Sequence, residues 1–132
     1  VEEGLADAIF KHQWRESARA RILFLVLDAP PHENPEQMAK LHEAVQDAAR
    51  QGIRIIPIAG SGIDKPTEFL MRFLAVSTDG TYVFLTDDSG VGGSHAKPTI
   101  GPHTVEYLSH LLVKIINRHL EVEDIRPVRR AP

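Results

Sequence analysis

Length, composition and charge place the chain among single-domain globular proteins. Its 132 residues suffice for one domain of ordinary size, and 42% hydrophobic with 25% charged residues is typical of a globular fold. Fifteen basic against eighteen acidic residues give a formal charge of −3 without a basic stripe, which argues against a nucleic-acid partner. The lack of cysteine excludes disulfides and thiolate sites, and no apolar run reaches the roughly 18 residues of a membrane span.

The first predicted elements are an amphipathic helix over 3–13 and a strand over 22–28. Residues 22–27 form an uninterrupted apolar run rich in branched side chains, which favours a strand buried on both faces, as in a parallel sheet covered by helices. Asp28 stands where this strand leaves the core, and ligands of open α/β sheets bind beyond the carboxyl ends of the strands. The sequence leaves open whether Asp28 shapes a turn or belongs to a site.

A helix and a strand follow with clear boundary signals. Asn34 before Pro35 is a typical helix start, and Gly52 is a typical residue just past a helix end. The apolar stripe expected on this helix comprises Met38, Leu41, Val45, Ala48 and Ala49. The next strand covers 53–59, where Pro57 removes one ladder donor and is therefore expected near an end or an irregularity.

The remaining elements are a helix over 66–77, a strand over 81–86 and a helix over 102–120. The side chains expected to point inward from the first of these helices are Phe69, Leu70, Phe73 and Leu74. Those expected to point inward from the last helix are Leu108, Leu111, Leu112, Ile115 and either His119 or its neighbours. The polar loop 87–101 is long enough to be functional or mobile, and 121–132 is expected to be an exposed tail.

The alternation of helices and strands predicts a three-layer α/β/α, Rossmann-like fold, with a parallel sheet of about three strands and helices on both faces. Sequential βαβ units place 53–59 beside 22–28, with 81–86 beyond it. The sheet is thin for this fold class, and the chain opens inside a helix without an initiator methionine. We therefore expect a fragment of a longer domain.

Three stretches carry a resemblance to a known family. They are "LVLDAPPH" (25–32), "GIRIIPIAGSG" (52–62) and "EFLMRFLAVSTDGTYVFLTDDSG" (68–90), followed by the closing helix. In order and spacing they resemble the second half of a von Willebrand factor A domain of a bacterial branch, with the first stretch similar to the fourth strand of that family. The resemblance spans roughly residues 4 to 120. It implies that 1–120 form a partial domain of this family and that 121–132 lie outside it.

The resemblance also implies a function, which is protein binding or adhesion without chemistry of its own. The family binds a divalent cation, Mg²⁺ or Mn²⁺, through an Asp-x-Ser-x-Ser loop, a Thr and an Asp after the fourth strand, and the protein ligand completes the coordination. Only the last of these has a counterpart, which is Asp28. We therefore expect Asp28 to be a metal ligand in the intact parent domain, and this chain alone to bind the cation weakly or not at all, since one carboxylate is a poor octahedral site. An extracytoplasmic or cell-surface parent protein fits this reading.

The ligand-binding rim is expected on the loops that follow the strands. Its candidate residues are His32, Ser61, Asp87, Asp88 and His95. His32 itself is open between an exposed turn residue and a pH-sensitive or metal contact. The alternative from another class is a small doubly wound enzyme or nucleotide-binding domain that uses the loops 60–64 and 87–101. Against it, the Gly-Ser-Gly turn at 60–62 lacks the third glycine of a dinucleotide loop, and Asp64 would repel a pyrophosphate.

Self-association is the last expectation. If the resemblance holds, strand 22–28 lacks a neighbour on one edge, and no charge or proline within 22–27 discourages pairing with another chain. We therefore expect a two-fold dimer through strand 22–28, with helix 3–13 helping to cover the seam.

Overall fold

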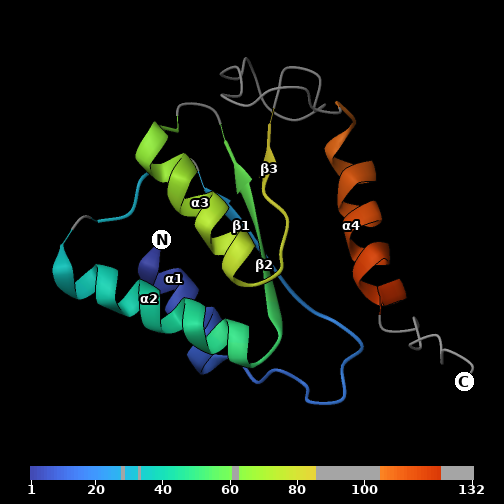
Figure 1. The fold of residues 1–132 in the computed structure, drawn as a ribbon, viewed down its shortest axis with the longest axis horizontal. Helices are drawn as coiled ribbons and strands as arrows, with labels where there is room; N and C mark the ends of the chain where they lie inside the picture. Colours follow the sequence, from blue (N-terminus) through green and yellow to red (C-terminus); the bar gives the residue numbers. More distant parts are fainter. Residues whose placement is uncertain (28, 33, 61–62, 86–104, 123–132) are drawn as a thin grey trace, which may run out of the picture.

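The fold is described by a computed structural model of the chain, shown in Figure 1. The residues it describes are 1–27, 29–32, 34–60, 63–85 and 105–122. The predicted loop 87–101 and nearly all of the predicted tail 121–132 therefore lie outside the described residues. Glu121 and Val122 belong to the last helix rather than to a tail.

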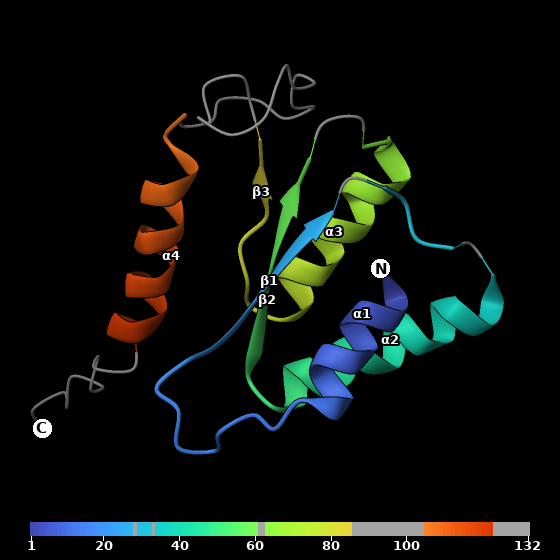
Figure 2. The same cartoon turned by 180° about the vertical axis from the view of Figure 1, so that it is seen from behind.

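A parallel three-stranded sheet forms the middle of the structure. Its strands are β1 (Arg21–Leu27), β2 (Ile53–Ala59) and β3 (Val83–Phe84), in the spatial order β1-β2-β3. This confirms the predicted fold class and strand order. Helices α1, α2 and α3 cover one face of the sheet, and α4 covers the other (Figures 1 and 2). No helix within the described part of the chain has the length and apolar character to cross a membrane.

The helices begin and end close to the predicted positions, with two exceptions. Their bounds are Glu2–Ala6 for α1, Pro35–Arg50 for α2, Lys65–Ser77 for α3 and Leu108–Val122 for α4. The first helix was predicted over 3–13, but α1 continues as a π-helical turn, Asp7–Lys11, and the backbone is extended at His12. The last helix was predicted from Pro102, but the described residues 105–107 are not helical and α4 begins at Leu108.

Local capping chemistry fixes the ends of α2 and the start of α3. The Asn34 side chain accepts a hydrogen bond from the Gln37 N–H at 2.9 Å, as the sequence predicted for a helix start. Asp64 does the same for α3, accepting from the Thr67 N–H at 2.9 Å. Gly52 follows α2 with a φ of 66°, a left-handed conformation that favours glycine.

The strands differ in burial, and here the prediction for the first strand was wrong. β2 is buried at six of its seven residues, whereas β1 is buried only at Leu27, and Val26 is 69% exposed. The two strands pair in register along their whole length, from Arg21 opposite Ile53 to Leu27 opposite Ala59. Because β1 is the edge strand of the sheet, its apolar run does not gain the two-sided cover that β2 receives.

β3 is shorter than the predicted strand 81–86, because other groups occupy the edge of β2 before β3 begins. The buried Thr78 hydroxyl accepts the Ile55 N–H at 2.9 Å, in place of a ladder bond. Gly80 passes so close to this point that a Cβ on it would lie 1.9 Å from the Ile55 carbonyl oxygen. Pairing with β3 then covers only Ile58 and Ala59.

Backbone directions along β2 explain why Pro57 is tolerated in the central strand. The Gly60 N–H donates to the Leu27 carbonyl of β1 at 2.8 Å, and the Leu85 N–H donates to the Ala59 carbonyl at 3.0 Å. Since these groups alternate in direction along a strand, the missing N–H of Pro57 faces the side of β3. Pairing with β3 starts only one residue later, so no ladder bond is lost. Pro57 thus lies two residues before the end of β2, in agreement with the expectation of a position near an end.

The inward faces of the helices were predicted in part. On α2 the core residues include Ala44, which the prediction missed, while Ala49 is exposed. On α3 the prediction was wrong for Phe69 and Phe73, which are 74% and 37% exposed. The α3 residues that are buried instead are Thr67, Met71 and Ala75, together with the correctly predicted Leu74. On α4, Ile115 and His119 are buried as predicted, and the three leucines are partly buried.

Candidate functional site

The predicted ligand rim falls largely outside the described residues. The carboxyl ends of β1, β2 and β3 lie at the same end of the sheet, as parallel strands require (Figure 1). The rim and metal residues that lie outside the described part of the chain are Asp28, Ser61, Asp87, Asp88 and His95. Among the residues that the structure does describe, no three histidine or acidic side chains are grouped as a metal site would need.

His32 is the one predicted rim residue that the structure describes. Its side chain is exposed, and its Nδ1 lies 2.5 Å from Oε1 of Glu2, the first residue of α1. Glu2 is buried, with 2% of its surface exposed. Its own backbone N–H, the His32 contact and the terminal amine together lower the Glu2 carboxyl pKa to about 2, against the opposing effect of burial. His32 therefore ties the segment after β1 to α1, a contact that no spacing in the sequence signalled.

A second polar group lies at the opposite end of the sheet from the rim. Arg54 near the start of β2 lies 3.6 Å from Asp79, measured from Nε to Oδ2, and His119 of α4 is buried beside them. Burial, reinforced by the charge of Arg54, lowers the pKa of His119, so the imidazole is held neutral. These residues join α4 to the sheet away from the carboxyl ends of the strands.

The outer edge of β1 is a long open edge of the sheet within the described residues. The bond from Gly60 to the Leu27 carbonyl shows that Leu27 directs its polar groups toward β2. Alternation then directs the N–H and C=O groups of Ile22, Phe24 and Val26 away from β2. Within the described residues no strand pairs with this edge. Three donors and three acceptors therefore stand in a row along one side of the molecule.

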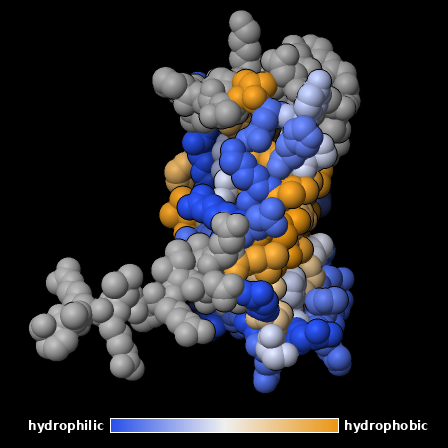
Figure 3. All heavy atoms as spheres, turned by 90° about the vertical axis from the view of Figure 1, so that its right-hand side faces the viewer, coloured by the Kyte–Doolittle hydropathy of each residue, from blue (hydrophilic) through white to orange (hydrophobic). Residues whose placement is uncertain are grey.

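The side chains of the same three residues lie on the face of the sheet that α4 covers only in part. Ile22 and Phe24 pack against the cluster that α4 forms with β2 and β3, and they remain partly exposed. Val26 is left with most of its surface in water. Figure 3 shows an apolar area that flanks the hydrophilic outer side of α4. The edge of β1 thus combines apolar side chains with backbone groups that no described strand pairs with.

Comparison with known proteins adds no relative. No protein-family model matches the chain, and neither the curated proteins nor the solved structures contain a significant match to it. The resemblance to von Willebrand factor A domains therefore rests on the residues quoted for it.

Proposed function

We propose that the chain is a protein-binding module, similar to the second half of a von Willebrand factor A domain, and that it binds protein by adding a strand to the edge of β1. The observation that carries the proposal is the row of outward N–H and C=O groups at Ile22, Phe24 and Val26. A regular apolar edge of this kind is a template for an extended segment of another chain. The proposal assigns no catalytic step to the chain.

Metal-mediated recognition belongs to the same proposal for the intact parent domain. Asp28 would there hold Mg²⁺ or Mn²⁺ together with ligands from other loops, and an acidic group of the partner would complete the shell. This part rests on the resemblance alone, because Asp28 lies outside the described residues. In that intact domain the edge of β1 would pair with the neighbouring strand that this chain lacks, so strand addition is proposed for this chain and metal-mediated recognition for the parent domain.

A second copy of the chain fits the edge without any further element. In an antiparallel two-fold pairing centred on Phe24, Ile22 of one copy lies opposite Val26 of the other. All three positions then exchange hydrogen bonds with an apolar residue, and no like charges face each other. The pairing covers part of the exposed surface of Val26, which favours association.

The test compares two lysine substitutions at valines of similar exposure. Val26→Lys places a charge on the proposed seam, and Val113→Lys places one on α4, where Val113 is 58% exposed against 69% for Val26. Neither side chain is in the core, so both variants should fold. Sedimentation equilibrium should show a concentration-dependent dimer for the original chain and for Val113→Lys. For Val26→Lys we expect the dissociation constant of the dimer to rise about ten-fold or more. A ten-fold rise corresponds to about 1.4 kcal/mol of association free energy.

Two results would refute the proposal. One is a folded chain that stays monomeric at the highest concentration reached. The other is equal weakening by both lysines, which would point to the outer face of α4 rather than to the edge of β1.

A further inference from the structure

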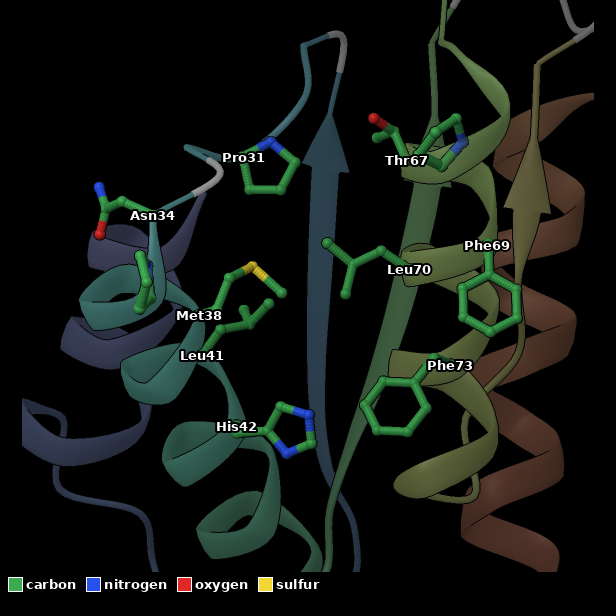
Figure 4. Close-up of a pocket in the computed structure, with 11 residues that line it drawn as sticks. Pro31, Asn34, Met38, Leu41, His42, Thr67, Phe69, Leu70 and Phe73 are labelled. Carbon is green, nitrogen blue, oxygen red and sulfur yellow. The ribbon is translucent and has the colours of Figure 1, made fainter.

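A groove lies between α2 and α3 on the face of the sheet opposite to α4 (Figure 4). Its volume is about 640 Å³. Its walls are mainly apolar, and the side chains that matter for the argument are Met38, Leu41, His42, Leu70 and Phe73. Sites for small ligands commonly measure roughly 300–1,000 Å³ and have walls of this composition.

The two walls of the groove come from different helices. Figure 4 shows Met38, Leu41 and His42 projecting from α2 toward Leu70 and Phe73 of α3. Leu41 is buried, while Met38 and Leu70 are partly exposed and pack against the core beneath them. The groove therefore has a floor fixed by the core and walls fixed by two regular helices.

Aromatic rings close one end of the groove. The rings of His42 and Phe73 face each other across it, with centroids 5.7 Å apart and planes inclined by 39°. This spacing lies within the roughly 4.5–7 Å range of interacting aromatic pairs. Met38 adds a thioether, which adapts its shape to a ring and attracts it. An aromatic ligand would find partners on both walls.

The groove offers no charged partner. The described residues that line it include no Asp, Glu, Lys or Arg. Helix N-termini attract anions, but the first turns of α2 and α3 are already capped by Asn34 and Asp64. Burying a charge without a partner is costly, so a charged ligand is disfavoured here. The polar side chains at the groove include the amide of Asn34 and the hydroxyl of Thr67.

The helix α3 carries apolar side chains on two opposite faces. Met71 and Leu74 face the core, while Phe69 and Phe73 face outward with 74% and 37% of their surfaces exposed. A surface helix of a globular protein usually presents polar residues on its outer side. Contiguous exposed apolar surface that departs from this pattern marks an interaction site.

We propose that this groove binds a small uncharged aromatic molecule, with its ring packed against the Phe73–His42 pair that closes one end and against Met38 and Leu70 along the walls. The size of the groove, its ring-bearing end and its lack of charge carry the proposal together. The site is independent of the edge of β1, because the side chains of Ile22, Phe24 and Val26 lie on the opposite face of the sheet.

The experiment uses two fluorescent probes that differ by one sulfonate group, and therefore by one negative charge. N-phenyl-1-naphthylamine is uncharged near neutral pH, and 1-anilinonaphthalene-8-sulfonate is the same molecule with a sulfonate added. The full chain should bind the uncharged probe saturably, at one site, with an affinity about ten-fold or more above that of the sulfonate. Equal affinity for the two probes, or fluorescence that rises without saturation, would overturn the proposal.

Matched variants locate the binding. Phe73→Ala removes a ring from the groove, and Phe10→Ala removes a ring of similar exposure, 47%, that does not line it. Phe73→Ala should lower the affinity for the uncharged probe about ten-fold or more, and Phe10→Ala should leave that affinity unchanged. Equal losses in the two variants would contradict the assignment. Because Phe73→Ala could perturb folding, nuclear Overhauser contacts from the probe to the Met38 and Leu70 methyl groups of the original chain give a second test, and their absence would also contradict it.

The same variants also test whether a second copy of the chain, rather than a small molecule, occupies the groove. A second copy of the chain seated in the groove would make Phe73→Ala lower the apparent mass in sedimentation. That result, with no probe bound at saturation, would overturn the small-molecule assignment in favour of a protein interface.

Discussion

The two long strands of the sheet are alike in length and apolar composition and differ in what surrounds them. β1 and β2 each have seven residues, each is almost wholly apolar, and they pair in register from end to end. β2 is nevertheless buried at six residues and β1 at one. The difference shows that position in the sheet, rather than composition, decides how much an apolar strand contributes to the core. It also identifies β1 as the strand with surface left to bury.

The largest effect that tests this contrast comes from matched isoleucines. Ile56 of β2 and Ile22 of β1 share a hydrophobic cluster, but Ile56 is fully buried and Ile22 partly exposed. Ile56→Ala should cost about 2–5 kcal/mol of unfolding free energy, and Ile22→Ala about half as much or less. Denaturant unfolding at a concentration where the chain is monomeric measures both. Equal losses would show that the edge strand is as well packed as the central one.

A smaller effect concerns the other edge of β2. Thr78→Val removes the hydroxyl that accepts the Ile55 N–H and leaves a buried donor without a partner, which should cost about 1–3 kcal/mol. Thr78→Ser keeps the hydroxyl and serves as the control. We expect Thr78→Ser to retain most of the stability that Thr78→Val loses in the same unfolding measurement. A valine variant as stable as the original chain would remove this account of why β3 is short.

The sequence predicted those features that depend on neighbours along the chain. The cap at Asn34, the bounds of strand 53–59 and the left-handed residue Gly52 follow from local chemistry, and all three are confirmed. The strand order also follows, because short βαβ connections leave few alternatives.

The features that the sequence missed depend on residues far apart in the chain. Periodicity on α3 could not decide which of its apolar side chains meet the sheet, so Leu74 was predicted correctly, while Phe69 and Phe73 were placed inward wrongly. The contact between Glu2 and His32 joins segments thirty residues apart, with no pattern to announce it. Of the predicted site, only His32 lies among the described residues, so the placement of Asp28 stays a prediction.

The smallest expected effect is a pH dependence of the stability that arises from His119 of α4, which packs beside Arg54 near the start of β2. The pKa of His119 is lowered by burial and by Arg54, so the unfolded chain takes up a proton there more readily than the folded chain. The contribution of His119 to the free energy of unfolding is therefore fully present above the unfolded pKa of about 6.5. It decreases as the pH falls below that value.

The measurement is thermal unfolding between about pH 7 and about pH 5, where histidine is the side chain that titrates. His119→Gln should reduce the pH dependence of the unfolding temperature in this window. His110→Gln replaces an exposed histidine of the same helix and serves as the control, in which this pH dependence should be retained. An unchanged slope in His119→Gln would contradict the assignment.

The central claim is that the outward backbone groups of β1 are the binding edge, and amide hydrogen exchange resolved by residue tests it most directly. The amides of Leu23 and Leu25 point toward β2 and should be protected at every protein concentration. The amides of Ile22, Phe24 and Val26 should exchange freely in dilute protein and gain protection as the concentration rises, with no such gain in Val26→Lys. If these three amides exchange at the same rate at all concentrations, or are already protected in the monomer, the edge of β1 is not the interface.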